Sequence, residues 1–136
     1  MIGKAVYSIL YADANVEANV STRIFPSINY KATNTYPYLV YHHTIDEPND
    51  TKSGVSTLNT ATIQVNTYDV NKMDSETLAE YVRIALDRKS GTYGTIVVQS
   101  VQYTDQSDAF DLTGYEDFDG VFQISQTFKI RYEPIN

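Results

Sequence analysis

The two histidines are the first residues to consider as metal ligands or as a catalytic base. His42 and His43 are adjacent in a segment whose composition is typical of a β-strand. Side chains of neighbouring strand residues point to opposite faces of a sheet, so the two imidazoles cannot bind one metal ion together. We therefore expect no zinc site here. One histidine is interpreted as part of the sheet face, and the other as facing solvent or a helix.

Nucleophile and phosphate-binding motifs are missing from the sequence. No Gly-x-Ser-x-Gly elbow occurs, and the six glycines form no phosphate-binding loop. Two pairs of adjacent carboxylates, Asp46 with Glu47 and Glu116 with Asp117, fall in predicted polar loops. Acid–base catalysis by a carboxylate needs burial that these loops do not offer. We interpret the pairs as solubilising charges, and we expect neither an enzyme nor a bound cofactor.

An acidic segment over residues 105–119 carries most of the excess negative charge. The chain has a net charge of -7 at pH 7, and this segment contains no lysine or arginine. Its acidic residues are Asp105, Asp108, Asp111, Glu116, Asp117 and Asp119. Their spacing does not fit the calcium-binding EF-hand loop. We interpret the segment as a solvated loop or an assembly contact.

The composition predicts one soluble domain and argues against several other classes. The 136 residues have the length of one ordinary domain, and the 42% hydrophobic content is enough for one core. The chain has no cysteine, so disulfides and cysteine-bound metals cannot stabilise the fold. No segment reads as a signal peptide or a membrane span, and we expect no membrane contact. The acidic balance argues against a nucleic-acid-binding surface.

Hydrophobic periodicity predicts two helices and four strands. Residues 2–13 place apolar side chains at helical spacing. A second helix is predicted to begin at Asp74 or Ser75 and to stop near Gly91. The strands are predicted over residues 38–45, 57–68, 95–104 and 121–133. The stretch between the first helix and Tyr36 is interpreted as irregular, with an apolar island that packs under the helix.

The order helix, two strands, helix, two strands predicts an α+β fold. We expect a mostly antiparallel four-stranded sheet with two helices packed on one face, in a single domain of residues 1–136. The last strand alternates most clearly, and its 13 residues would reach about 43 Å. This length is large for a compact domain of this size. We therefore expect the strand to bend, fray or project, and a projecting strand would offer a sheet edge for self-association.

Tyrosine is unusually frequent, with twelve copies and no tryptophan. A tyrosine couples a large apolar ring to a polar hydroxyl, which suits protein interfaces. Alternatively, the tyrosines on predicted strands fill the faces of the sheet; these are Tyr36, Tyr38, Tyr41, Tyr68, Tyr103 and Tyr132. The sequence leaves both interpretations open.

Three short segments resemble, in order and spacing, the beginning of the tail-completion family, the tail terminators of long-tailed (siphovirus-type) bacteriophages. They are Arg23-Ile24-Phe25-Pro26, Tyr36-Pro37-Tyr38-Leu39-Val40-Tyr41 and Asp46-Glu47-Pro48. Further similar segments are the strand over residues 61–68, the helix over 76–87 and the strand over 128–132. The resemblance therefore covers nearly the whole chain. The long acidic segment between the last two strands departs from the family pattern.

The resemblance implies a structural virion protein without a catalytic step. Proteins of this family form a ring, typically a hexamer, on the head-proximal end of the completed tail tube. The ring stops tube polymerisation and presents the surface that joins the head. The implied partners are further copies of the chain, the tail tube protein and a head-completion or connector protein, while DNA passes through the ring without specific binding. The implied location is the virion tail, after synthesis in the host cytoplasm.

Acidic residues are the candidate assembly or channel contacts. A ring subunit needs two different contact patches, because its contacts must close by rotation. As a hypothesis, residues 105–119 line the channel, where like charge repels passing DNA, or they contact the tail tube. The candidate residues are Asp46, Glu47, Asp50, Asp105, Asp108, Asp111, Glu116, Asp117 and Asp119.

Two other functions fit the same sequence. A head-completion or connector subunit at the neck shares the small ring-forming character, and microscopy of its position would separate it from a terminator. A small-ligand binding domain would use a tyrosine-lined pocket between the helices and the sheet. A closed, filled core would argue against that second function.

Overall fold

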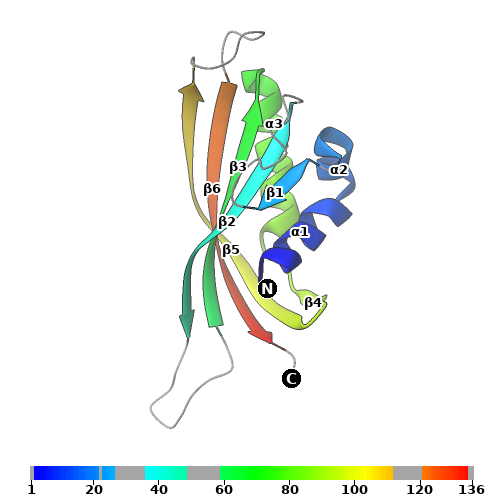
Figure 1. The fold of residues 1–136 in the computed structure, drawn as a ribbon, viewed down its shortest axis with the longest axis vertical. Helices are drawn as coiled ribbons and strands as arrows, with labels where there is room; N and C mark the ends of the chain where they lie inside the picture. Colours follow the sequence, from blue (N-terminus) through cyan, green and yellow to red (C-terminus); the bar gives the residue numbers. More distant parts are fainter. Residues whose placement is uncertain (1, 22, 27–35, 49–58, 112–120, 135–136) are drawn as a thin grey trace.

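A computed structural model describes residues 2–21, 23–26, 36–48, 59–111 and 121–134. Within these ranges the chain forms three helices and six strands, and the helices lie on one side of a strongly twisted sheet (Figure 1). None of the described helices combines the length and the hydrophobicity that crossing a membrane requires.

The N-terminal segment forms two consecutive helices. α1 (Ile2–Ala12) confirms the predicted first helix and buries one stripe of apolar side chains. Asp13 then begins α2 (Ala14–Val20), because its carboxylate accepts hydrogen bonds from the backbone N–H groups of Asn15 and Val16 at 3.0 and 3.1 Å. The prediction of an irregular stretch is wrong for residues 14–20, since seven residues suffice here to form a capped helix with two buried valines. Residues 27–35 of that stretch lie outside the described residues.

A three-residue strand follows α2. β1 (Ile24–Pro26) pairs in parallel with β2 (Tyr38–Pro48). Arg23 holds the pair together, because its Nε donates to the carbonyl oxygen of Pro37 at 3.0 Å and its own carbonyl oxygen accepts from the N–H of Leu39 at 3.0 Å. The apolar island in the sequence is therefore an edge strand, which is too short to show the periodicity of a strand.

The longer elements agree with the predictions in type and differ mainly in their ends. β3 (Asn59–Asp69) and β6 (Val121–Pro134) lie close to two of the predicted strands. α3 (Lys72–Leu86) begins earlier than predicted, because Asn71 is its N-cap and accepts a hydrogen bond from the N–H of Asp74 at 3.1 Å.

The end of α3 also differs from the prediction. Asp87 is the C-cap, and Gly91 does not stop the helix but begins β4 (Gly91–Tyr93). A tight turn through Gly94 leads into β5 (Ile96–Asp111), which pairs with β4 antiparallel. Gly94 has a φ of 63°, a conformation that glycine adopts without steric cost.

The sheet is mixed and has six strands in the order β1-β2-β3-β6-β5-β4, which corrects the predicted four-stranded, mostly antiparallel sheet with two helices. The unpredicted elements are one short helix and two three-residue strands, none long enough to show a periodic pattern. Of the three expectations for the last strand, that it bends, frays or projects, projection with a free edge is not what the structure shows. β6 lies between β3 and β5 and pairs along both of its sides, so its length is matched by its neighbours.

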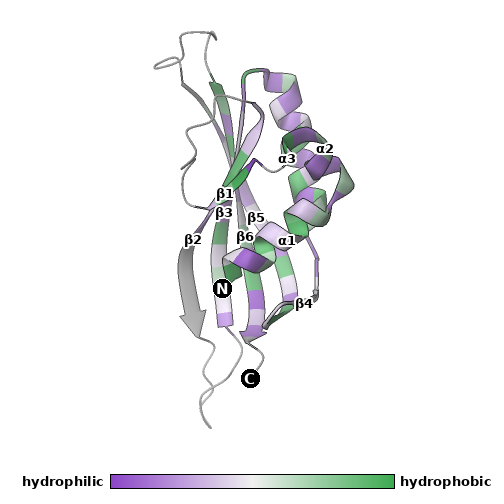
Figure 2. Ribbon diagram, turned by 45° about the vertical axis from the view of Figure 1, so that its right-hand side comes forward, coloured by the Kyte–Doolittle hydropathy of each residue, from purple (hydrophilic) through white to green (hydrophobic). Residues whose placement is uncertain are grey.

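One hydrophobic core fills the space between the helices and the sheet. Its largest fully buried side chains include Phe128 and Ile63 from the sheet, with Leu10 from α1 and Leu78 from α3. Figure 2, coloured by hydropathy, shows all three helices on the same side of the sheet. The main core thus lies on that side, and the opposite face of the sheet has only a smaller buried cluster.

Candidate functional site

The face of the sheet that points away from the helices, here called the open face, is mostly polar. Alternation with the buried Ile63 places Thr62 and Gln64 on it. Cross-strand register adds short polar and amide side chains from β6 and β5: Gln123, Ser125, Thr127, Gln102 and Ser107. Lys129 and Arg131 are exposed on the same face. Such a face suits solvent or a wet contact with another protein.

An aromatic cluster occupies one end of the open face. Phe25, Tyr38 and Val40 are buried there, and Tyr36 and Tyr68 pack against them. The rings of Tyr38 and Tyr68 stack with their centroids 4.8 Å apart. The other tyrosines of the predicted strands pack in the core on the helix side: Tyr41, Tyr103 and Tyr132. These six tyrosines therefore fill the faces of the sheet, which was one of the two interpretations.

The acidic candidate residues do not lie in one loop. β2 is longer than predicted, so Asp46 and Glu47 lie in a strand. β5 is also longer and includes Asp105, Asp108 and Asp111. The predicted solvated loop is therefore wrong for its first part, because this part of the chain pairs with β6. The remaining candidates lie outside the described residues: Asp50, Glu116, Asp117 and Asp119.

Two of these carboxylates are exposed on opposite faces of the sheet. Asp105 is paired with Thr127 on the open face, and Asp108 is paired with the buried Ile124 on the helix side. A bulge between Tyr103 and Asp105 determines on which face of the sheet each of these side chains lies. A channel wall formed by one face of the sheet would therefore contain only one of the two carboxylates.

The two histidines also lie on opposite faces, as predicted. His42 is paired with Gln64 on the open face, and His43 is paired with Ile63 on the helix side. In the part of the chain that the structure describes, no three histidine, aspartate or glutamate side chains gather where they could hold a metal ion.

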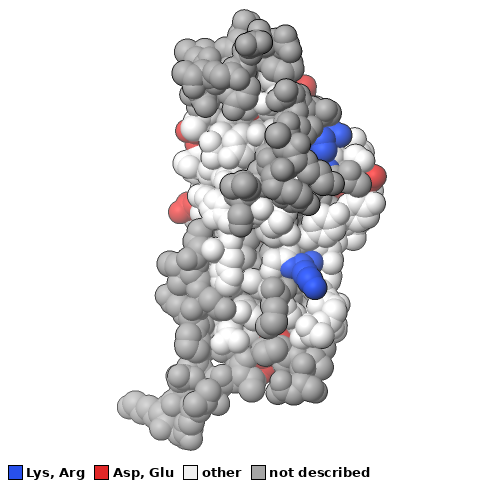
Figure 3. All heavy atoms as spheres, viewed as in Figure 1, with Lys and Arg blue, Asp and Glu red and all other residues white. Residues whose placement is uncertain are grey.

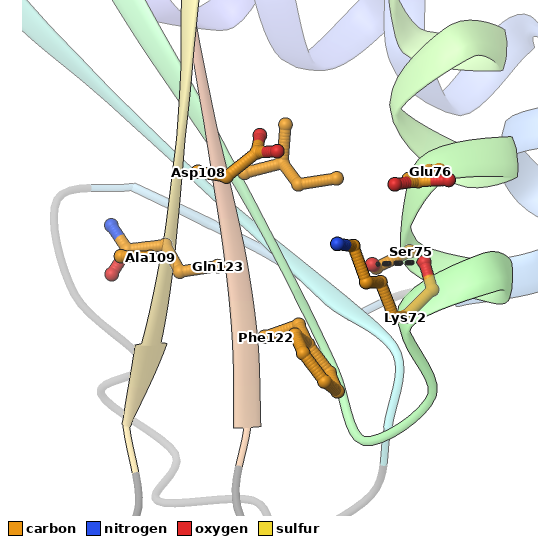
Figure 4. Close-up of a pocket in the computed structure, with 8 residues that line it drawn as sticks. Lys72, Ser75, Glu76, Asp108, Ala109, Phe122 and Gln123 are labelled. Atoms are coloured by element: carbon orange, nitrogen blue, oxygen red, sulfur yellow. Dashed lines mark hydrogen bonds between the residues drawn. The ribbon is translucent and has the colours of Figure 1, made fainter.

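The hollows beside the helices are very small or lie at the surface. One lies under the N-terminal end of α3, where Lys72 and Glu76 project toward the strands that carry Asp108 and Phe122 (Figure 4). Its volume is about 10 Å³, which is room for about one water molecule. Two surface grooves flank α1, one beside the β4–β5 turn and one beside the edge of β2. None of these three is a closed pocket for a small ligand between the helices and the sheet.

A buried polar network links α3 to β5 and β6. Gln126 is fully buried, and its Nε2 donates to the carbonyl oxygen of Ala79 at 2.9 Å and to Oε1 of Gln106 at 3.3 Å. The hydroxyl of Tyr103 donates to the same Gln106 oxygen at 3.4 Å. The guanidinium of Arg83 lies 4.2 Å from the centroid of the Tyr103 ring. These contacts hold α3 in one position across the strands.

The sequence carried a signal for this network that the periodicity argument did not use. Gln126 stands at an apolar position of β6, between Ile124 and Phe128 on the helix side. A glutamine at such a position is costly to bury without hydrogen bonds. It therefore predicts a polar partner on the opposing helix, which the structure supplies through Ala79.

Asp69, at the end of β3, is a buried carboxyl group. Burial raises the pKa of Asp69 above its usual value of 3.8, and the nearby charge of Asp74 acts in the same direction. The backbone N–H groups of Val70 and Asn71 oppose this effect, and the first donates to the Asp69 carboxylate at 2.7 Å. Because the pKa is raised on folding, this group stabilises the fold most below its unfolded pKa, and the contribution is lost as the pH rises through its folded pKa.

Asp69→Asn should therefore be more stable than the parent protein at pH 7. The amide oxygen keeps an acceptor for the N–H of Val70 without a buried charge. The difference in unfolding free energy should shrink as the pH falls through the folded pKa of Asp69 and should be nearly gone once the pH is below its unfolded pKa of about 4. Denaturant unfolding at several pH values measures it. Glu80→Gln, on the exposed side of α3, is the control for removing one negative charge. A gain that is the same at pH 3 and pH 7 would contradict the role of ionisation.

Charged side chains are scattered over the face seen in Figure 3. Basic side chains occur there singly, and no basic patch gathers on the part of that face that the structure describes. A surface that neutralises several phosphates needs clustered lysines or arginines. The described part of this face shows no such cluster.

Comparisons with known proteins relate the chain to others by fold only. No protein-family model matches the chain, and no curated protein matches it. A chain in a solved structure described as the virion of a native gene transfer agent particle is similar, with a TM-score of 0.66 and 19% sequence identity. The match covers 94% of this chain and 91% of that chain. The two chains thus share a fold over nearly their whole lengths.

Proposed function

We propose that this chain is a structural virion protein, and specifically a tail terminator that forms a ring at the head-proximal end of a tail tube. The ring would stop tube polymerisation and join the tail to the head. The observation that carries the proposal is the shared fold, since a chain of a virion particle matches 94% of this chain. A match of this extent involves the whole domain, so it is not explained by one common motif.

Two segments that resemble the tail-completion family form one structural unit, which supports the proposal. The Arg-Ile-Phe-Pro segment is β1 with the residue before it, and the Tyr-Pro-Tyr segment begins β2. The two strands pair in parallel, with Ile24 beside Leu39 and Phe25 beside Val40. Each segment alone is too short to identify a family, but the two are joined by hydrogen bonds in the fold.

The two edges of the sheet differ, and this also fits a ring subunit. β1 covers only part of β2 on one side, and β4 covers only part of β5 on the other. A ring is built from heterologous contacts, in which two different patches of one subunit meet. Two unlike edges can provide such patches without any reactive group. We propose six copies, with DNA passing through the ring without specific binding.

Deleting the gene, followed by electron microscopy of the particles, tests the proposal. We expect tubes that are longer than in the parent and that lack heads, because nothing stops polymerisation or joins the head. Expression of the chain from a plasmid should restore tails of normal length. Tails of normal length attached to heads would refute the proposal. Tails of normal length beside full, tailless heads would instead favour a head-completion or connector subunit at the neck.

A further inference from the structure

We propose that neighbouring copies in the ring meet with β1 of one copy beside the free edge of β5 of the next. This inference rests on the proposed ring, and it identifies the two patches that close it. The occupant of each edge is thus a second copy of this chain. The argument uses the outline of the sheet, the directions of its strands and the charges near its two edges.

The two three-residue strands lie at different levels of the sheet, so the two edges have stepped outlines. β1 pairs with β2 only from Leu39 to Tyr41, which leaves residues 42–48 of β2 without a described strand on their outer side. β4 pairs with β5 only from Ile96 to Val98. The next part of the edge is covered by the end of α3, because the N–H of Arg88 donates to the carbonyl oxygen of Val101 at 2.8 Å and the Asp87 carboxylate accepts from the N–H of Tyr103 at 3.2 Å. No described strand lies outside residues 104–111, here called the free part of β5. Figure 1 shows β4 at the lower end of the sheet and β1 nearer its middle.

Register relates the two steps. β1 lies beside Leu39 of β2. Across the sheet, Leu39 pairs with Thr67 of β3, Thr67 with Ile124 of β6, and Ile124 with Asp108 of β5. β1 therefore lies at the same height along the strands as the free part of β5. β4 lies instead at the level where β2 ends. Between β5 of one copy and β2 of the next, β4 of the first copy and β1 of the second can therefore lie end to end in the position of a single strand. Each short strand then lies beside the part of the neighbouring copy's edge that the neighbour's own short strand leaves uncovered.

Strand directions favour the same contact. β2 is antiparallel to β3, β3 to β6, and β6 to β5, so β2 and β5 run in opposite directions. β1 is parallel to β2. Repetition of the subunit around an axis along the strands therefore places β1 antiparallel to β5 of its neighbour. Antiparallel pairs form short ladders readily.

The charges near the two edges are complementary. Lys4 lines the groove beside Pro26 at the end of β1, and Arg23 directly precedes the strand. Asp105 and Asp108 are exposed on the free part of β5. Bringing these edges together pairs basic groups with acidic ones. Opposite charges of this kind select the partner and its register more than they add affinity.

Irregularities along both edges keep the contact short. Pro26 has no N–H to donate, and β5 has bulges between Val98 and Ser100 and between Tyr103 and Asp105. Bulges and prolines on edge strands prevent free subunits from pairing indiscriminately. The contact between two copies is therefore weak on its own, and the ring closes only when a tube end holds several copies together.

Cysteine cross-linking tests the contact directly, because the natural chain has no cysteine. Pro26→Cys is combined in turn with Asp105→Cys, Ser107→Cys and Asp108→Cys, and each double variant is expressed in the deletion background. After mild oxidation of assembled particles, at least one of the three should give a ladder of multiples of the 15.3 kDa chain. Residues on adjacent antiparallel strands lie within the Cα separation that a disulfide spans. The ladder should collapse on reduction.

The control pairs Pro26→Cys with Met73→Cys, which is 77% exposed on α3. Cross-linking of this control, with none in the three β5 variants, would overturn the inference. If microscopy still showed rings, the proposed function would stand.

A second measurement does not depend on disulfides. Asp105→Lys with Asp108→Lys should reduce completed particles about tenfold, the ratio that about 1.4 kcal/mol produces, without a change in unfolding midpoint. Glu80→Lys should not, and equal losses in both would also overturn it.

Discussion

Phe128→Ala should lower the free energy of unfolding by about 3 to 5 kcal/mol. Phe128 is fully buried in β6, the strand that joins the two halves of the sheet. Its ring meets the ring of Tyr103 edge-on at a centroid distance of 5.7 Å, and it is paired with Ile63 on β3. Truncation leaves a cavity that cannot close easily, because the ladders on both sides fix the positions of the strands.

Denaturant unfolding followed by circular dichroism measures this loss. Met73→Ala is the matched control, because Met73 is also a large apolar side chain but is 77% exposed. We expect the control to change stability by less than about 0.5 kcal/mol. A loss below about 1 kcal/mol in Phe128→Ala would mean that the centre of the sheet is packed differently.

Leu10→Ala should cost about 2 to 5 kcal/mol, the next largest effect. Leu10 is fully buried, and α1 packs through its apolar stripe against α2, α3 and the sheet. Alanine keeps the helix, since its helical propensity is the highest of all residues. The loss therefore reports packing of α1 on the domain and not the formation of the helix.

Lys4→Ala on the same helix is the control for this experiment. Lys4 is exposed, and its replacement should change the unfolding free energy by less than about 0.5 kcal/mol. Equal effects of the two variants on the midpoint of unfolding would show that α1 contributes little to the core. The comparison also matters for assembly, because α1 lies beside the groove at the end of β1.

Interior and edge substitutions should separate folding from assembly. Phe128 and Leu10 act on the core, so their variants should reduce the amount of folded chain before any ring forms. Asp105 and Asp108 are exposed on strand β5, and their variants should leave folding intact. A protein that works through its contact surfaces should show this separation. An enzyme would instead lose its activity through single side chains at one site.

The acidic residues show how far sequence reasoning reached for the candidate site. Their types and numbers in the sequence show a concentration of negative charge along residues 105–119. Their assignment to one loop depended on where a strand ends, and β5 continues to Asp111. Alternation fails to place Asp105 and Asp108 by itself, because a bulge after Tyr103 shifts the phase of the strand.

Sequence by itself determined the elements whose periodic pattern is long enough to recognise. The apolar stripe of α1, the alternation of β3 and β6, and the opposite faces of His42 and His43 all follow from local geometry. The lack of cysteine and of nucleophile motifs also needs no structure. These properties depend on neighbouring residues only, so they can be read along the chain.

Only the tertiary structure decided the order of the strands, and with it the edges. β6 is central although it is the last strand, and β1 and β4 are the outermost strands although neither has a recognisable pattern. Strand order depends on hydrogen bonds between segments far apart in the chain, such as β3 with β6. Short edge strands form because a longer neighbour offers them hydrogen-bonding groups, not because of their own propensity. The surfaces available to a second copy therefore come from long-range pairing.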